Sequence, residues 1–214
     1  NGGAVVTIPL GGSYTELGAT VSDNYDTELA VTIDSSAVNT SVVASYSVTY
    51  NVTDDSNNTG TATRTVNVVD QTLPVITLNG SNVTIEAGES YTELGATVSD
   101  NYDTGLSATI DSGAVNTSVL GSYSVTYNVT DGNSNVAQQV TRTLNVVDTT
   151  LPVITLNGSE VTIEVGGSYT ELGATASDNY YTGLSVTPTG AVNTSAVGTY
   201  TITYSATDDS NNTG

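Results

Sequence analysis

The fold of this chain is decided by the stretch Asp148-Thr149-Thr150-Leu151-Pro152-Val153-Ile154-Thr155-Leu156-Asn157-Gly158, which occurs earlier as Asp70-Gln71-Thr72-Leu73-Pro74-Val75-Ile76-Thr77-Leu78-Asn79-Gly80. A second motif, Tyr-Thr-Glu-Leu-Gly-Ala-Thr, is found at residues 14–20, 91–97 and 169–175. The motifs recur every 77 or 78 residues, which indicates a tandem array of three copies. We predict one small domain per copy, at residues 1–70, 71–148 and 149–214, with the first strand missing from copy one and the last strand missing from copy three.

The composition excludes several classes of chemistry. The chain contains no His, Cys, Lys, Trp, Met or Phe, so it has no imidazole base, no usual zinc or copper ligand and no Schiff-base lysine. Its only cations are Arg64 and Arg142, and the net charge is -20. Nucleic acid and anionic membranes are therefore unfavourable partners, whereas hard cations that bind oxygen ligands are favourable ones. We expect no enzyme activity and no disulfide framework.

The residue pattern predicts short strands joined by turns. The copies are rich in Val, Thr, Ile and Tyr and are punctuated by Gly, Asn and Asp. In copy two the predicted strands are residues 75–78, 83–86, 93–99, 106–110, 114–117, 122–130 and 136–147. The alternation is clearest at residues 122–130, where Tyr123, Val125, Tyr127 and Val129 share one face and polar residues occupy the other. No window shows a sustained helical period, so we expect no helix.

About seven short antiparallel strands per copy predict an all-β chain of tandem immunoglobulin-like β-sandwich domains. Tyr46, Tyr123 and Tyr200 each begin the penultimate strand of a copy, as the tyrosine of a tyrosine corner does in such sandwiches. The alternative is that these residues are ordinary core aromatics. The linkers are only a few residues long and are closed by Pro74 or Pro152, which makes them stiff. We therefore expect an extended rod.

These motifs, together with Ser-Asp-Asn-Tyr and Tyr-Ser-Val-Thr-Tyr-Asn-Val-Thr-Asp, resemble the Ig-like tandem repeats of bacterial surface proteins and are similar to HYR modules. The resemblance covers all three copies. It implies an extracellular stalk or adhesion array and no catalysis. Copy three departs from the pattern, because Tyr180-Tyr181 stands where copy two has Tyr102-Asp103, so one acid of that loop is lost.

The acidic residues are concentrated in linkers and loops. Strand alternation in a sandwich should return the loops at residues 100–103 and 131–135 to the pole where the linker residue Asp70 enters the domain, so carboxylates distant in sequence should converge there. Corresponding positions recur in the other copies. The candidate metal ligands are Asp23, Asp26, Asp54, Asp55, Asp70, Asp100, Asp103, Asp131, Asp148, Asp178, Asp208 and Asp209.

We predict Ca²⁺ as the ion that these residues bind. Crowded carboxylates repel one another unless a cation neutralises them, and Ca²⁺ takes about six to eight oxygen ligands that loops can supply. The alternative is that Asp and Asn serve only as turn residues. Paired acids also occur in glycosidases, but such an enzyme needs a cleft lined by stacking aromatics, and most Tyr residues lie on predicted core faces.

The sequence indicates a non-enzymatic, extracellular structural array at the cell surface. It would be the Ca²⁺-stiffened stalk of an adhesin or a subunit of a surface filament. The alternative is a set of carbohydrate-binding accessory modules of a secreted enzyme. A glycan array screen would separate the two, because a spacer gives no hits.

The expected partners are neighbouring copies of the array, including self-assembly into a filament. The incomplete copies one and three are explained either by a window taken from a longer array or by strand exchange between subunits. No run of apolar residues is long enough to insert into a membrane. Surface glycans are a further candidate, because ten Asn-x-Ser/Thr sequons are present at Asn39, Asn51, Asn57, Asn79, Asn82, Asn116, Asn128, Asn157, Asn193 and Asn211.

Overall fold

The computed structural model of the chain describes residues 2–214, and we call residues 1–70, 71–148 and 149–214 repeats one, two and three. The described residues form strands and no α-helix, so none of them forms a helix long and apolar enough to cross a membrane. The strands are β1 (Val5–Pro9), β2 (Thr32–Asp34), β3 (Ala44–Thr53), β4 (Thr59–Val69), β5 (Val75–Leu78), β6 (Val83–Glu86), β7 (Ala96–Ser99), β8 (Thr109–Asp111), β9 (Gly121–Asn128), β10 (Val140–Val147), β11 (Val153–Leu156), β12 (Ala174–Ser177), β13 (Val186–Thr189) and β14 (Thr203–Ala206). The predicted all-β class is confirmed.

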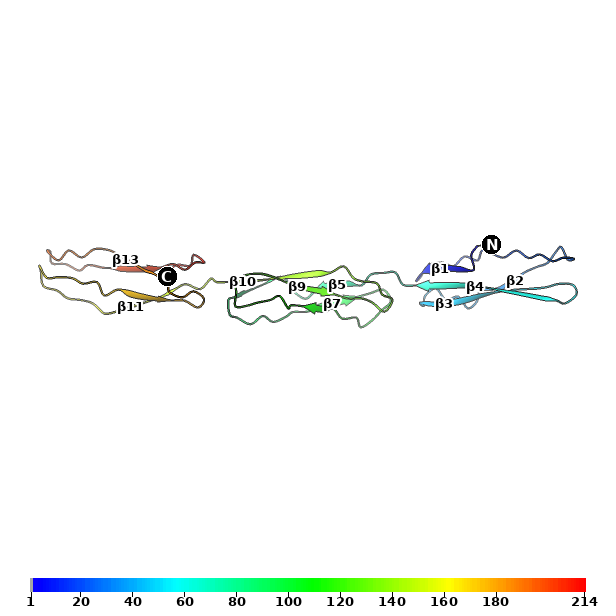
Figure 1. The fold of residues 1–214 in the computed structure, drawn as a ribbon, viewed down its shortest axis with the longest axis horizontal. Helices are drawn as coiled ribbons and strands as arrows, with labels where there is room; N and C mark the ends of the chain where they lie inside the picture. Colours follow the sequence, from blue (N-terminus) through cyan, green and yellow to red (C-terminus); the bar gives the residue numbers. More distant parts are fainter. Residues whose placement is uncertain (1) are drawn as a thin grey trace. The chain divides into compact units, whose positions relative to one another are not determined.

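Repeat one is organised around one four-stranded sheet with the order β1-β4-β3-β2. Its central pair is the antiparallel hairpin of β3 and β4, and Figure 1 shows β1 beside β4 in this part of the chain. The core lies on one face of the sheet and consists of Ile8, Val48, Tyr50, Val66 and Val68. These residues alternate along their strands with less buried ones, as a sheet with one buried face requires.

The expectation of purely antiparallel strands is wrong at one edge of each four-stranded sheet. Strand β1 pairs with β4 in parallel, and β6 pairs with β10 in parallel. The residue pattern predicts which face of a strand is buried, but the neighbour across a sheet edge comes from a distant part of the chain. Parallel neighbours need a long crossover connection, and the whole repeat separates the members of each pair.

Repeat two shows which strand predictions were accurate. Residues 75–78 and 83–86 form β5 and β6 with the predicted bounds. The third strand is shorter than predicted, because Gly95 adopts a positive φ of 75° just before β7 begins. The predicted strands 106–110, 122–130 and 136–147 shift or shorten to β8, β9 and β10. Residues 114–117 form no strand, because the amides of Val115 and Val119 close turns there.

The predicted faces of β9 and its continuation are confirmed. Val125 and Tyr127 have no exposed surface, and Val129 is 7% exposed. Thr126 and Asn128, on the other face, are partly exposed. Burial of this alternating apolar face is the main stabilising contribution, since each fully buried large side chain is worth roughly 1.5–3 kcal/mol.

Three tyrosines at corresponding positions of the repeats, two of them in β3 and β9 and the third just before β14, make the same hydrogen bond. The hydroxyls of Tyr46, Tyr123 and Tyr200 donate to backbone carbonyls four residues upstream, at 3.1, 2.8 and 3.2 Å respectively. This is the upstream hydrogen bond of a tyrosine corner, so these residues are more than core aromatics. The corner fixes the direction in which each strand leaves its loop.

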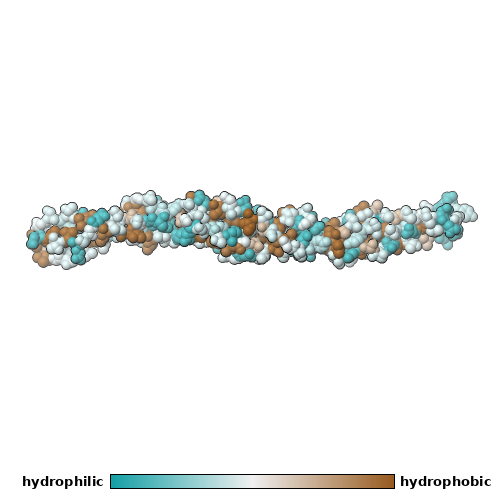
Figure 2. All heavy atoms as spheres, turned by 90° about the horizontal axis from the view of Figure 1, so that it is seen from below, coloured by the Kyte–Doolittle hydropathy of each residue, from teal (hydrophilic) through white to brown (hydrophobic). Residues whose placement is uncertain are grey.

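Several apolar side chains remain exposed beside the linkers, including Leu73, Val75, Leu151 and Val153. On the face drawn in Figure 2, hydrophobic residues form small separate groups among neutral and hydrophilic ones. Scattered apolar residues of this kind are normal on protein surfaces and do not by themselves mark an interaction site.

The chain divides into two compact units, and the division runs through repeat two and not through a linker. The first unit comprises residues 1–79, 96–109 and 127–140, and the second comprises residues 80–95, 110–126 and 141–214. Each linker therefore lies in the same unit as the two loops that we expect beside it. The predicted domain boundaries and the predicted extended rod stay predictions.

Candidate metal centres at the repeat junctions

The first acidic cluster gathers carboxylates from three separate segments of the first unit. Its members are Asp70, Asp100, Asp103 and Asp131, and each offers a carboxylate oxygen within 4.8 Å of those of the others. Asp70 lies in the linker after β4, Asp100 and Asp103 follow β7, and Asp131 follows β9. The expected convergence of these loops on the linker is therefore present in the structure.

Turn geometry explains why each loop places its aspartate here. One oxygen of Asp100 accepts hydrogen bonds from the amides of Tyr102 and Asp103, both at 2.9 Å. Asp70 accepts from the amide of Thr72 at 3.0 Å in the same way. These are the local turns that Asp favours, so the turn-residue alternative is correct for one oxygen of each carboxylate.

The second oxygen of two of these carboxylates has no hydrogen-bond partner. Asp70 is 5% exposed, and its Oδ2 atom is buried without a protein donor. The Oδ2 atom of Asp100 is likewise buried and unpartnered. A buried carboxylate oxygen without a partner is costly, and the cost rises when further carboxylates surround it. A role in forming turns does not account for these two unpartnered Oδ2 atoms.

An asparagine joins the loop to the linker. Asn135 donates from its side-chain nitrogen to Asp131 Oδ2 at 2.6 Å and to the backbone carbonyl of Asp70 at 3.2 Å. Its own amide donates to Asp131 Oδ1 at 2.7 Å. We did not predict a role for Asn135. The signal was available, because Asp is followed by Asn four residues later at 54/58, 131/135 and 208/212.

The second acidic cluster repeats this arrangement inside the second unit. Its members are Asp148, Asp178 and Asp208, again with carboxylate oxygens within 4.8 Å of one another. The Oδ2 atoms of Asp148 and Asp178 are buried and unpartnered. Asn212 donates to Asp208 Oδ2 at 2.8 Å and to the backbone carbonyl of Asp148 at 3.2 Å. The same arrangement, an unpartnered linker aspartate oxygen and an asparagine that joins loop to linker, thus occurs at both linkers.

The acids of the clusters are electrostatically unequal. Burial is the main cause that raises the pKa of Asp148, and the charges of Asp178 and Asp208 raise it further. Hydrogen bonds from backbone amides lower the pKa values of Asp100 and Asp178. Within the second cluster, the charge of the linker aspartate Asp148 is therefore less well stabilised than that of Asp178.

The clusters differ at one position. Asp103 accepts a hydrogen bond from the amide of Gly132 at 3.0 Å, but its counterpart in repeat three is Tyr181. Tyr181 packs edge-on against Tyr180 and accepts a hydrogen bond from Ser210 at 3.2 Å. Asp209, a predicted ligand, corresponds to Gly132; it is exposed and lies outside the second cluster.

The corresponding acids of repeat one do not gather into such a cluster among the described residues. Asp23, Asp26, Asp54 and Asp55 do not belong to any group of three or more carboxylates found among residues 2–214. Asp23 closes a turn by accepting from the amide of Tyr25 at 2.8 Å, and Asp54 is bound by Asn58 at 2.7 Å. Metal binding by these four residues stays a prediction.

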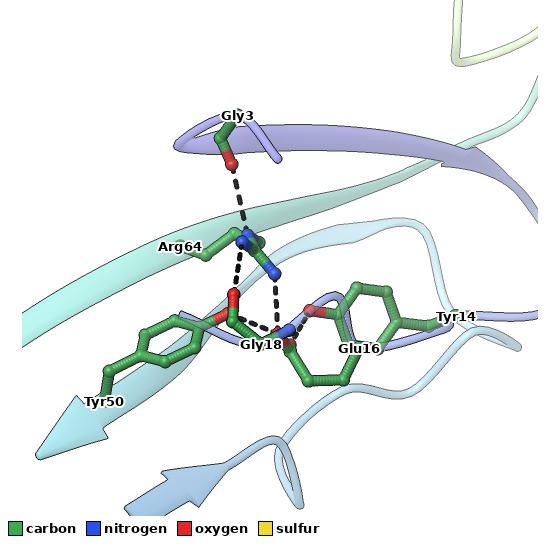
Figure 3. Close-up of polar contacts among 6 residues, drawn as sticks. All are labelled: Gly3, Tyr14, Glu16, Gly18, Tyr50 and Arg64. Atoms are coloured by element: carbon green, nitrogen blue, oxygen red, sulfur yellow. Dashed lines mark hydrogen bonds and ion pairs between the residues drawn. The ribbon is translucent and has the colours of Figure 1, made fainter. Parts of the chain in front are cut away.

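A second kind of site, a buried arginine paired with a glutamate, was not predicted at all, and Figure 3 shows it in repeat one. Arg64 on β4 is 5% exposed and forms an ion pair with Glu16 at 2.6 Å. The guanidinium also donates to the carbonyls of Gly3 and Gly18, at 3.1 and 3.3 Å. Glu16 accepts further hydrogen bonds from the hydroxyls of Tyr14 and Tyr50.

Repeat two repeats this arginine site. Arg142 has no exposed surface and pairs with Glu93, which also accepts from the Tyr91 hydroxyl at 2.5 Å. The signal in the sequence was the alternation around each arginine, which places Arg64 on the same face of β4 as the buried residues Val66 and Val68. Both cations of the chain are therefore engaged away from the acidic clusters.

Burial acts to raise the pKa of Glu16, but hydrogen bonds from Tyr14, Tyr50 and the Gly18 amide and the charge of Arg64 lower it to about 2. Repeat three has the glutamate without an arginine among the described residues. There, hydrogen bonds from Tyr204, Gly173 and Tyr169 lower the pKa of Glu171 to about 2.

Comparison with known proteins identifies the repeats. A family model described as "Bacterial surface protein, Ig-like domain" matches residues 1–68, 76–146 and 154–214. The three matches together span most of the chain, and each falls on one repeat. They confirm the resemblance drawn from the repeat motifs.

Two curated relatives are similar in sequence over part of their length. An 81.3 kDa protein of Acholeplasma phage L2 is 32% identical over 200 residues, which cover 85% of this chain and 26% of that protein. Hyalin of Strongylocentrotus purpuratus is 34% identical over 155 residues, which cover 64% of this chain and 13% of hyalin. The chain thus spans about a quarter or less of each relative.

Solved structures give only distant matches. The extracellular cadherin domains 1–4 of protocadherin gamma B7 align over 96% of this chain and 66% of theirs, with 14% identity and a TM-score of 0.35. The EC3–6 cis-dimer structure of protocadherin gammaB7 aligns over 98% and 62%, with 15% identity and a TM-score of 0.36.

Proposed function

The chain belongs to the bacterial surface protein Ig-like domain family, and on that premise we propose that it is a structural array whose junctions between repeats are held by Ca²⁺. One ion would bind at the first acidic cluster and another at the second. The bound ions would fix the orientation of each repeat relative to the next. The array would act as a stalk of an extracellular surface adhesin or as part of a surface filament, without catalysis.

The observation that carries this proposal is the pair of unpartnered linker oxygens. Asp70 and Asp148 are 5% and 6% exposed, and each has a buried Oδ2 atom with no hydrogen-bond partner. Each lies beside carboxylates from two loops of the following repeat. A cation would satisfy both unpartnered oxygens of a cluster and remove the repulsion among its members.

The donor set fits Ca²⁺ better than other common metals. The clusters offer carboxylate oxygens on loops and no nitrogen or sulfur ligand, which disfavours zinc and copper. Ca²⁺ accepts several carboxylates in a flexible arrangement, whereas Mg²⁺ requires near-ideal octahedral geometry and keeps several waters. Asp70, Asp100, Asp103 and Asp131 would hold the first ion, and Asp148, Asp178 and Asp208 the second.

The position of the clusters supports a junction role. The linker aspartate contributes its carboxylate to the cluster and its backbone carbonyl to the asparagine of a loop. Without an ion, like charges at the junction repel and relative motion of neighbouring domains is the default. With an ion, linker and loops share ligands and move together.

Small-angle scattering of the wild-type chain and of Asp148→Ala, each with CaCl₂ and with EDTA, tests this function. We expect a longer, narrower distance distribution for the wild type with Ca²⁺ and a broader one in EDTA. The variant should be intermediate with Ca²⁺, because only its first junction would be held. Identical profiles in all four samples would mean that the proline-closed linkers alone set the geometry.

The matched control is Asp55→Ala, which removes an acid of repeat one that belongs to no cluster of three or more carboxylates among residues 2–214. Its scattering should respond to Ca²⁺ as the wild type does. A control that responded like Asp148→Ala would indicate an effect of total charge and not of the junction.

A further inference from the structure

The two acidic clusters are built alike but are not equal. Each has a linker aspartate, an aspartate in the first loop, an aspartate in the second loop and the asparagine that joins that loop to the linker. The first cluster has a fourth carboxylate, Asp103. At the corresponding position the second cluster has Tyr181, whose hydroxyl is paired with Ser210.

The residue of the second loop that faces this position also differs between the two clusters. Asp103 receives the amide of Gly132, and a Cβ atom placed on Gly132 would lie 3.2 Å from an Asp103 carboxylate oxygen, which is tighter than an ordinary contact. Glycine therefore leaves room for the fourth carboxylate. In repeat three the glycine is replaced by Asp209, whose side chain is exposed.

Resting on the proposed function, we propose that the two junctions bind Ca²⁺ with unequal affinity and that the residue at position 103 or 181 sets the difference. The first junction, with four carboxylates, fills at lower Ca²⁺ than the second, with three. The number of charged ligands is one of the properties that tune Ca²⁺ affinity over orders of magnitude in loop sites. The expected ratio of dissociation constants is on the order of tenfold.

Repeat one shows that an aspartate at the position of Asp103 can accept a backbone hydrogen bond from the other acidic loop even when that loop has no glycine at the position of Gly132. Asp26 corresponds to Asp103, and its carboxylate accepts the amide of Asp55 at 3.3 Å, compared with 3.0 Å for Asp103 and Gly132. The aspartate and glycine together give the closer approach. Copying the fourth carboxylate into repeat three therefore requires substitution to both the aspartate and the glycine.

The consequence is stepwise ordering of the array. At intermediate Ca²⁺ the junction between repeats one and two is held while the junction between repeats two and three is still open. Both junctions are held only at higher Ca²⁺.

Amide NMR of the full chain during a CaCl₂ titration tests the proposal, because each junction has its own reporters. The Gly132 amide donates to Asp103, and the Asn212 amide donates to Asp208 at 2.8 Å. We expect the Gly132 signal to shift at about tenfold lower Ca²⁺ than the Asn212 signal. Coincident midpoints, or a lower midpoint for Asn212, would overturn the inference while leaving Ca²⁺ binding intact.

The decisive variant is Tyr181→Asp combined with Asp209→Gly. It copies the Asp103 and Gly132 pair into repeat three and leaves the net charge at -20. The Asn212 midpoint should move to that of Gly132, and the reciprocal Asp103→Asn should raise the Gly132 midpoint about tenfold. If neither variant shifted the midpoint of its CaCl₂ titration, the residue at position 103 of repeat two, or at position 181 of repeat three, would not determine the Ca²⁺ affinity.

The matched control is Tyr180→Asp, which adds a carboxylate to the same loop one residue away. It should leave the order of the two midpoints unchanged. Absence of any Ca²⁺-dependent shift at either junction would instead refute the proposed function itself, so the two failures are distinguishable.

Discussion

Two kinds of carboxylate site occur in this molecule, and only one of them is neutralised by the chain itself. Glu16 and Glu93 lie beside Arg64 and Arg142, the only cations of the sequence. Asp70 and Asp148 are more deeply buried than these glutamates but lie beside other carboxylates and keep an unpartnered oxygen. The glutamate sites are complete within one repeat, whereas each aspartate site joins a linker to two loops of the following repeat.

This difference indicates which sites of the chain depend on cations from the surrounding solution. A carboxylate that is paired within its own repeat stabilises that repeat in any medium. A carboxylate cluster without a cation is a source of repulsion until the solution supplies one. The stabilisation from the glutamate sites should therefore be independent of divalent ions, while the stabilisation from the aspartate clusters and the order of the junctions should depend on them.

The largest effect is expected at the arginine sites. Arg142→Met should lower the free energy of unfolding of repeat two by about 3–5 kcal/mol, because it removes a fully buried arginine and leaves the partly buried Glu93 without its charged partner. Chemical denaturation measures the loss. Adding Glu93→Gln to the same chain should recover part of it, and CaCl₂ should leave the difference from the wild type unchanged. Recovery by Ca²⁺ would erase the distinction between the two kinds of site.

The next effect concerns the aspartate clusters. A hundredfold excess of Ca²⁺ over the dissociation constant should stabilise the folded chain by about 2.7 kcal/mol for one site that binds only the folded form. Melting curves in CaCl₂ and in EDTA measure this, and Asp100→Asn should reduce the difference. Asp23→Asn, the same change at the corresponding position of repeat one, is the control and should melt as the wild type does in both media.

A smaller effect isolates the asparagine that joins loop and linker. Asn212→Ala removes hydrogen bonds to Asp208 and to the Asp148 carbonyl, whereas Asn58→Ala removes only the equivalent bonds to Asp54. The excess loss for Asn212→Ala should be about 1 kcal/mol, the value of one net hydrogen bond. Its Ca²⁺ affinity should also fall by roughly tenfold, as when a residue that orients a ligand is lost. Equal losses of stability in the two variants would show that the linker carbonyl contributes nothing.

The last effect is the pH dependence of the glutamate sites. The pKa of Glu16 falls from an ordinary value of 4.5 to about 2 on folding, so the folded state binds fewer protons between these values. Its stabilising contribution is complete above about pH 4.5 and is lost as the pH falls towards 2. Unfolding curves measured from pH 6 down to pH 2 should show this decline, and it should be weaker in Glu16→Gln. A decline of unchanged steepness in that variant would assign the acid sensitivity to other carboxylates.

Much of the fold could be predicted from local patterns. The face of β9 followed from the alternation of Tyr123, Val125 and Tyr127 with polar residues, and the tyrosine corners followed from their place in each copy. The convergence of Asp70 with Asp100 and Asp131 followed from strand alternation alone. The parallel edge pairs, the buried arginines and the role of Asn135 did not, because each depends on a partner about fifty residues or more away.

One tetrapeptide separates what the sequence alone determined from what the tertiary structure decided. Val83-Thr84-Ile85-Glu86 is strand β6, whereas the identical Val161-Thr162-Ile163-Glu164 is not a strand. The first pairs along β10, and the described part of repeat three contains no counterpart of β10. The sequence alone determined composition, alternation, turns and the charge that each loop carries, because these are local properties. Tertiary structure decided which segments become strands and which carboxylates meet, because a strand is completed only by hydrogen bonds to a neighbour distant in the chain.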